Sequence, residues 1–232
     1  MLPKIDLPIL ELTLPSNGKI IKFRPFTVKE EKILLIAQES EDPDQEILAT
    51  KQIIGNCLIN DDVTEFAMFD LEYILLVVRA RSVDNSFQFT IKDPDTEEPI
   101  ELKIDIDKIT ITKDESHTNK IKINDEYTMF LKYPKIDEFI KIVKLDPKDP
   151  LASYFIMTSC LDKLASDDEV FDFKDYSNDQ IDGFMDSMTG DVIKSIQKFF
   201  DTMPKVRHEL KYKNKEGTEK TFVIEGMRTF FI

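Results

Sequence analysis

The central part of the chain, residues 86–106, carries the pattern that most restricts the fold. Apolar side chains recur at every second position on both sides of a polar stretch, 92–99, which is rich in turn-forming residues. A period of two predicts strands with one buried and one solvated face, and the turn residues predict an antiparallel hairpin. The alternating side chains are Phe87, Phe89, Ile91, Ile100, Leu102, Ile104 and Ile106.

Further strand pairs are predicted near both ends of the chain and just after the central hairpin. One covers residues 9–26 around the turn Ser16-Asn17-Gly18, one covers 120–133, and one covers 206–224 around a turn at 214–217. In each of them, β-prone residues are interrupted by residues that favour turns. The strands of this chain are therefore expected to be mostly antiparallel.

Helical patterns separate these strand pairs. Thr27 and Glu30 form a capping-box pattern that opens a helix to about Glu39, and Ser177 and Gln180 repeat the pattern later. Hairpins that alternate with clusters of helices favour the α+β class over a doubly wound sheet. The other helices are predicted at about 44–58, 68–81, 134–144, 150–163, 177–187 and 189–203.

With 232 residues, the chain can form one large domain or two small ones. The patterns divide it into four segments. They are an N-terminal hairpin plus helical bundle at 1–85, a β-hairpin region at 86–133, a helical region at 134–204, and a C-terminal hairpin with an apolar tail at 205–232.

Composition excludes several classes of function. The formal net charge of -14 disfavours nucleic acids and anionic membranes as partners and favours proteins. With only 6 glycines and no glycine-rich loop, the chain lacks the backbone that nucleotide-binding folds use around phosphates. No apolar run approaches a membrane span, and the start of the sequence lacks a signal-peptide pattern. We therefore expect a soluble protein made in the cytoplasm.

The two cysteines, Cys57 and Cys160, each lie inside an apolar, helix-like stretch. They lack the CxxC spacing of a zinc site, and an isolated pair does not suggest a disulfide framework. We predict that both are reduced thiols in the core.

The sequence shows no catalytic constellation. His117 lies in a polar linker, His208 lies on an alternating strand, and there is no G-x-S-x-G turn, so both are interpreted as ordinary surface or sheet histidines. Four acids at 93–98 could hold a hard cation, but the EF-hand spacing and its glycine are missing. A solvated turn is favoured there. We predict no enzyme activity, no cofactor and no metal, with a metal-dependent hydrolase as an alternative.

The end of the sequence is unusually apolar, with Phe230, Phe231 and Ile232 as its last residues. Chain termini are usually polar and frayed. These side chains either dock on the chain's own core or anchor in a neighbouring subunit, where aromatic residues supply much of the binding energy. Both interpretations stay open.

Two blocks of the sequence resemble a known family. Residues 22–34, KFRPFTVKEEKIL, resemble the N-terminal signature of the baseplate hub proteins of T-even-type contractile-tailed phages. Residues 69–83 contain FDLEY and RARSV, which resemble a second block of that family. The resemblance implies a late viral protein that is needed to build the baseplate hub, either as a hub component or as its assembly factor. We expect it in the tail baseplate of the virion and, during assembly, in the host cytoplasm. It carries no catalytic residues over.

Three surfaces are predicted to bind partners. The first is the elbow of Arg24 and Phe26 with the helix after it, and the third is the apolar tail, Phe230, Phe231 and Ile232. In the second, Arg79 and Arg81 could pair with acidic partners, although ion pairs within this acid-rich chain explain them equally well.

The expected partners are other baseplate, hub and tail proteins, and copies of this chain. A dissociable assembly chaperone, absent from the finished virion, is the alternative to a structural hub component.

Overall fold

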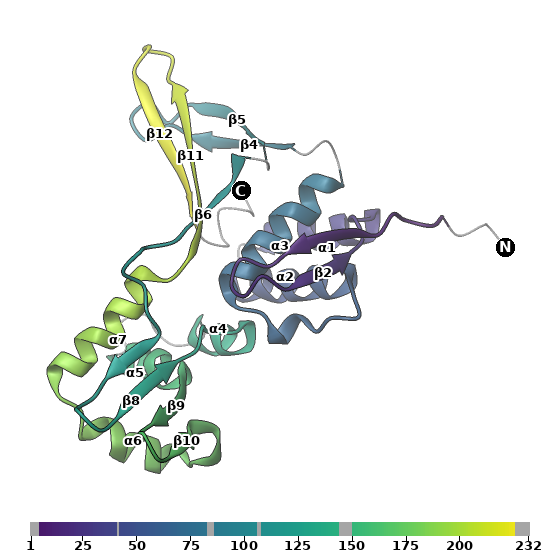
Figure 1. The fold of residues 1–232 in the computed structure, drawn as a ribbon. Coiled ribbons are helices and arrows are strands. Elements are labelled where there is room, and N and C mark those ends of the chain that lie inside the picture. The colour runs from purple at the N-terminus through teal and green to yellow at the C-terminus, as the bar shows by residue number, and fades with distance from the viewer. Residues whose placement is uncertain (1–4, 41, 83–85, 106–107, 144–149, 226–232) are drawn as a thin grey trace. The chain divides into compact units, whose positions relative to one another are not determined.

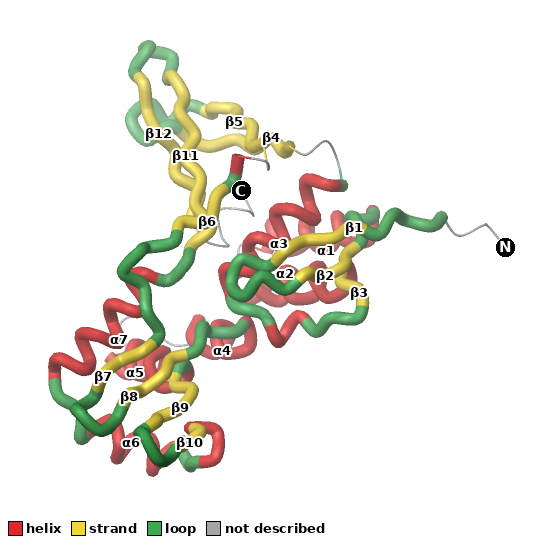
Figure 2. Tube along the Cα trace, viewed as in Figure 1, coloured by secondary structure: helices red, strands yellow, loops and turns green. Residues whose placement is uncertain are grey.

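The computed structural model describes residues 5–40, 42–82, 86–105, 108–143 and 150–225. It confirms the α+β class, since helices and antiparallel strands share the chain (Figure 2). The chain divides into two compact units, Met1–Thr112 with Lys205–Ile232 as unit 1 and Lys113–Pro204 as unit 2. The C-terminal strands thus belong to the same unit as the N-terminal residues. The finer division into four segments stays a prediction.

The N-terminal part of unit 1 combines a small antiparallel sheet with three helices (Figure 1). The strands are β1 (Leu10–Thr13), β2 (Ile20–Phe23) and β3 (Leu58–Ile59), and the helices are α1 (Val28–Ser40), α2 (Pro43–Cys57) and α3 (Met68–Arg81). Phe23, Leu34, Ile54 and Leu71 are at most 1% exposed, and they join the sheet and the helices in one core. Helix α3 is apolar on most sides and is correspondingly buried along most of its length.

The remainder of unit 1 consists of two antiparallel β-structures. These are the hairpin of β4 (Ser86–Lys92) with β5 (Pro99–Asp105), and a sheet of β6 (Thr110–Thr112), β11 (Lys205–Lys213) and β12 (Glu219–Glu225). Phe89 faces Leu102 across the hairpin, both are buried, and the Phe89 ring lies 5.7 Å from that of Phe222. The period of two predicted for residues 86–106 is confirmed at the positions whose side chains the structure describes, whereas Ile106 and the side chain of Phe87 lie outside them.

Unit 2 is a four-stranded antiparallel sheet with helices packed against it. The strands are β7 (Lys120–Lys122), β8 (Thr128–Leu131), β9 (Leu161–Ala165) and β10 (Val170–Asp172), and the helices are α4 (Ile136–Val143), α5 (Pro150–Ser159), α6 (Asn178–Asp186) and α7 (Gly190–Thr202). Met129 of β8 and Ile196 and Phe199 of α7 are at most 1% exposed and form the centre of its core.

One predicted helix is wrong in its last four residues. We expected residues 150–163 to be helical, but α5 ends at Ser159 and Leu161–Ala165 forms β9, which pairs with β8. Strands β3 and β10 were also not predicted. Strand β3 gains its backbone hydrogen bonds from β2, far along the chain, and β9 gains part of its own from the distant β8, so the local sequence of both contains little signal. β10 pairs with the neighbouring β9 and was missed together with it.

Candidate partner-binding surfaces

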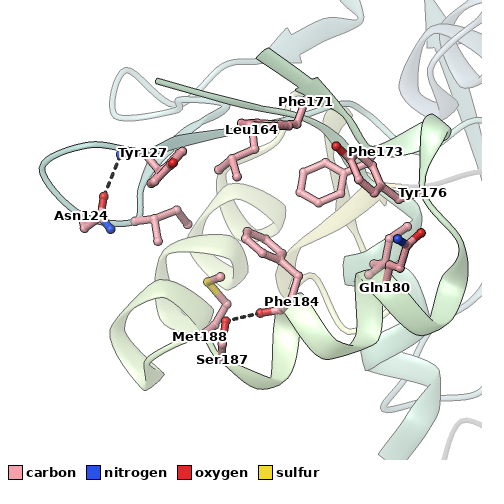
Figure 3. Close-up of a pocket in the computed structure, with 12 residues that line it drawn as sticks. Asn124, Tyr127, Leu164, Phe171, Phe173, Tyr176, Gln180, Phe184, Ser187 and Met188 are labelled. Atoms are coloured by element: carbon pink, nitrogen blue, oxygen red, sulfur yellow. Dashed lines mark hydrogen bonds between the residues drawn. The ribbon is translucent and has the colours of Figure 1, made fainter. Parts of the chain in front are cut away.

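Unit 2 contains an open apolar pocket of about 570 Å³ (Figure 3). It is built from the β7–β8 turn, the β9–β10 hairpin and α6 with the residues that follow it. The lining residues are Ile123, Asn124, Tyr127, Leu164, Phe171, Phe173, Tyr176, Gln180, Ile181, Phe184, Ser187 and Met188. None of these twelve side chains carries a charge.

Local hydrogen bonds place two walls of this pocket. The Asn124 side chain accepts hydrogen bonds from the backbone N–H groups of Glu126 (2.9 Å) and Tyr127 (2.7 Å), which fixes the turn that carries Tyr127. Ser177 and Gln180 form the predicted capping box at the start of α6, with the Ser177 N–H donating to Gln180 Oε1 at 3.0 Å. The cap orients α6 so that Phe184 faces the hairpin.

The floor of the pocket is aromatic. The Phe173 and Phe184 rings lie 5.5 Å apart at 56°, and Phe171 pairs with Leu164 across the β9–β10 hairpin. Tyr176 at the rim is 39% exposed. A concave apolar site with a few polar groups at its edge suits an aromatic or aliphatic side chain of a partner. We did not predict this pocket, because its walls come from segments that the sequence pattern does not connect.

Unit 1 has a second apolar surface, which we call the α1 patch, made of Val28, Leu35 and Ile36. These side chains are 72%, 50% and 69% exposed, while Leu34 on the other side of the same helix is 1% exposed. Helix α1 therefore carries apolar side chains on two sides, and only one of these sides is buried in the core of unit 1. Exposed clusters of this kind mark interaction surfaces.

A buried ionic network fixes the start of α1. The Glu30 carboxylate is 0% exposed and accepts two hydrogen bonds from the Arg24 guanidinium, at 3.0 and 3.2 Å. It also accepts from the Thr27 N–H at 2.9 Å, as the capping-box pattern predicts, and from the Asn56 amide at 3.3 Å. Burial alone would raise the pKa of Glu30, but the hydrogen bonds from Arg24 and Thr27 lower it to about 2.

Comparison with known proteins decides the family. The family model of the T4 bacteriophage base plate protein matches residues 7–232. The chain belongs to this family. No curated protein and no solved structure matches it.

A T4-type base plate protein is a structural protein of the tail baseplate in the virion and contacts other baseplate and tail proteins there. The resemblance seen in the sequence is therefore confirmed at the level of the baseplate. In the parts of this base plate protein that the structure describes, no helix has the length and apolarity needed to cross a membrane.

The first two predicted surfaces of the base plate protein are brought together. Arg24 is bound to Glu30, and the Phe26 N–H donates to Ser82 Oγ at 2.6 Å, next to Arg81 at the end of α3. Arg81 is exposed, whereas Arg79 is half-buried. Burial lowers the pKa of Arg79, and the charge of Glu31 raises it. Partner binding by these four residues stays a prediction. Phe230, Phe231 and Ile232 lie outside the described residues.

The acidic hairpin tip of the base plate protein is only in part the solvated turn that we expected, because Asp93 is buried while Asp95 and Glu97 are exposed. Asp93 is 0% exposed and accepts hydrogen bonds from the Tyr212 hydroxyl at 3.0 Å and the Lys220 ammonium at 3.1 Å. Lys220 also binds Asp95 at 2.5 Å, and Lys215 binds Glu98 at 2.8 Å. Asp93, Asp95 and Glu98 thus pair with lysines of the β11–β12 hairpin. Among the described residues, no three His, Cys, Asp or Glu side chains are grouped to hold a metal.

The remaining candidate side chains of the base plate protein are also packed. His117 is half-buried rather than a surface residue, and its ring nitrogens share hydrogen bonds with Thr202 Oγ1 and the Tyr133 hydroxyl, both at 2.9 Å. Cys57 and Cys160 are free and buried, as predicted, and burial raises the pKa of each thiol to about 12. Such thiols stay protonated and unreactive.

Proposed function

We propose that this base plate protein is a structural subunit of the baseplate hub and acts through protein–protein contacts alone, without catalysis or a cofactor. One observation carries the proposal: the α1 patch presents three exposed aliphatic side chains on a helix whose first turn is held by a buried ion pair. A rigid element that exposes apolar side chains is suited to a lasting contact with a partner.

The position of the patch supports the hub in particular. Residues 22–34 and 69–83 carry the resemblance to hub proteins, and the same two blocks are joined in unit 1 by the bond between Phe26 and Ser82. The first block contains Arg24, Glu30 and Val28. The first block therefore contributes Val28 and the ion pair that supports the patch, and Leu35 and Ile36 follow directly after it.

The test replaces one patch residue in the phage. Ile36→Glu places a charge where a partner's apolar side chains would be, and we expect few complete baseplates in electron micrographs of infected-cell lysates. Ile20→Glu is the matched control, since Ile20 is 59% exposed on β2 and lies outside the patch. Normal baseplate numbers in the Ile36→Glu phage would remove the α1 patch from the proposal.

Mass spectrometry of purified particles separates the hub subunit from the assembly chaperone. A hub subunit remains in the finished virion in a constant ratio to other baseplate proteins. Absence of the chain from particles whose assembly nevertheless requires it would overturn the hub proposal in favour of the chaperone.

A further inference from the structure

We propose that the aromatic pocket of unit 2 binds the segment Phe230-Phe231-Ile232 of a second copy of this chain, so that copies associate head to tail. This inference rests on the proposed function, because it names one partner through which the hub subunit acts. Each copy carries one pocket and one such segment, so a single contact can be repeated from copy to copy.

The pocket has the shape and chemistry that two phenyl rings require. Figure 3 shows the side chains of Leu164, Phe173, Phe184 and Met188 directed toward a common space. Aromatic rings pack on one another at centroid distances near those between Phe173 and Phe184, and the Met188 thioether adds favourable sulfur–ring contacts. An aliphatic side chain such as that of Ile232 fits the remaining apolar wall.

The charges around the pocket also favour the segment Phe230-Phe231-Ile232 as its occupant. Residues 161–186, which form the β9–β10 hairpin and α6, contain nine acidic residues and two lysines. An acidic segment would be repelled from this surface, whereas residues 226–232, GMRTFFI, have Arg228 as their one charged side chain. Asp167, Asp168 and Glu169 are exposed at the hairpin turn and are available to a cation on a partner. Complementary charge of this kind steers association and fixes register.

Three polar side chains that line the pocket already make hydrogen bonds within the chain itself. Gln180 serves the cap of α6, Asn124 serves the β7–β8 turn, and Ser187 Oγ donates to the Phe184 carbonyl at 2.6 Å. The site therefore offers mainly apolar contact. A small polar ligand would therefore gain little binding free energy in this pocket, whereas an apolar peptide segment would gain much more.

The experiment pairs two variants of the full-length chain in sedimentation-equilibrium measurements. Phe230→Asp/Phe231→Asp removes the rings and keeps the pocket. Ser187→Trp fills the pocket from an exposed position and keeps the segment. We expect the unmodified chain to associate with rising concentration, each variant alone to associate at least tenfold more weakly, and an equimolar mixture to regain a one-to-one dimer.

Three outcomes would overturn the inference. An unmodified chain that stays monomeric has no such contact, and a Ser187→Trp chain that associates normally does not use this pocket. If the mixture fails to recover and the phenylalanine variant unfolds at a lower temperature, the segment docks within its own chain. Phe171→Asp is a second pocket variant, and circular dichroism checks that both pocket variants fold.

This result can be told apart from a failure of the hub proposal. Ile36→Glu changes the α1 patch and should leave self-association within twofold of the unmodified chain, while it impairs baseplate assembly. Loss of self-association in that variant would show that copies meet through α1 and would overturn the assignment of the pocket.

Discussion

The two units of this protein are stabilised by different kinds of side chain. The buried polar and charged side chains of the described residues all lie in unit 1, namely Glu30, Thr50, Asp70, Asp93 and Asn214. Unit 2 instead packs rings, with Phe199 lying 5.2 Å from His117 and 5.6 Å from Tyr133. A buried ion pair demands one geometry, whereas ring packing tolerates several.

The difference explains the two kinds of candidate surface. In unit 1, polar bonds fix the helix and leave its second apolar side, the α1 patch, free for a partner. In unit 2, the aromatic side chains exceed what a small core can enclose, and the surplus lines an open pocket. If this comparison is correct, mutations and pH should affect the two units differently.

The largest effect is expected from Phe199→Ala in unit 2. Phe199 is 1% exposed, and replacing such a ring with a methyl group leaves a cavity that costs about 4 kcal/mol of unfolding free energy. Urea denaturation followed by circular dichroism measures the loss. Lys198→Ala on the same helix is the control, because that side chain is exposed. A loss below 1 kcal/mol would mean that the rings of unit 2 repack easily.

Glu30→Ala should have the next largest effect, in unit 1. Removing the carboxylate leaves the Arg24 guanidinium without its main partner in a partly buried site, which costs about 3 kcal/mol. The double variant Arg24→Ala/Glu30→Ala should lose less than the two single variants together, since both remove the same ion pair. Glu39→Ala, at an exposed position of α1, serves as the control. Strict additivity would show that the pair is not coupled.

Acid should weaken unit 1 more strongly than unit 2. The pKa of Glu30 falls from its ordinary 4.5 in the unfolded chain to about 2 in the folded protein. Its contribution is fully present above pH 4.5 and is lost as the pH falls toward 2, because protons then bind more readily to the unfolded state. The hydrogen bonds of Asp93 lower its pKa in the same direction, against the opposing effect of burial. Between pH 6 and pH 2, the unfolding temperature of Glu30→Gln should depend less on pH than that of the unmodified chain. An equal pH dependence of the two chains would show that Glu30 is not the titrating group.

The smallest effect concerns His117 in unit 2. Burial, together with the charge of Lys113, lowers its pKa below the ordinary 6.5. The neutral ring is therefore the stable form, and stability should decline as the pH drops below 6.5, where the unfolded chain takes up the proton first. Comparing thermal unfolding at pH 7.5 and 5.5 for the unmodified chain and His117→Gln tests this. The unfolding temperature of His117→Gln should change less between the two pH values than that of the unmodified chain. An equal change in both would mean that another group titrates.

Elements with local signals were predicted well. Helix α3 spans the predicted 68–81, the capping box of Ser177 and Gln180 is present, and the β4–β5 hairpin has the predicted alternation at its described positions. Each depends on neighbours within a few residues, whose spacing can be read along the chain. The family resemblance was likewise local, since it rested on two short blocks.

Local sequence was not enough where the partner lies far along the chain. β9 was predicted as helix because its pairing with β8 is absent from its own residues. The sequence contained Glu30 and Asp93 but did not show that they are buried, since Asn56 and Lys220 meet them only after folding. The aromatic pocket also needs three separate segments to converge. Amino-acid order alone determined the elements with strong local signals and which charges the chain carries. Only the tertiary structure decided which of those charges are desolvated and which apolar side chains stay exposed, because burial depends on contacts between distant residues.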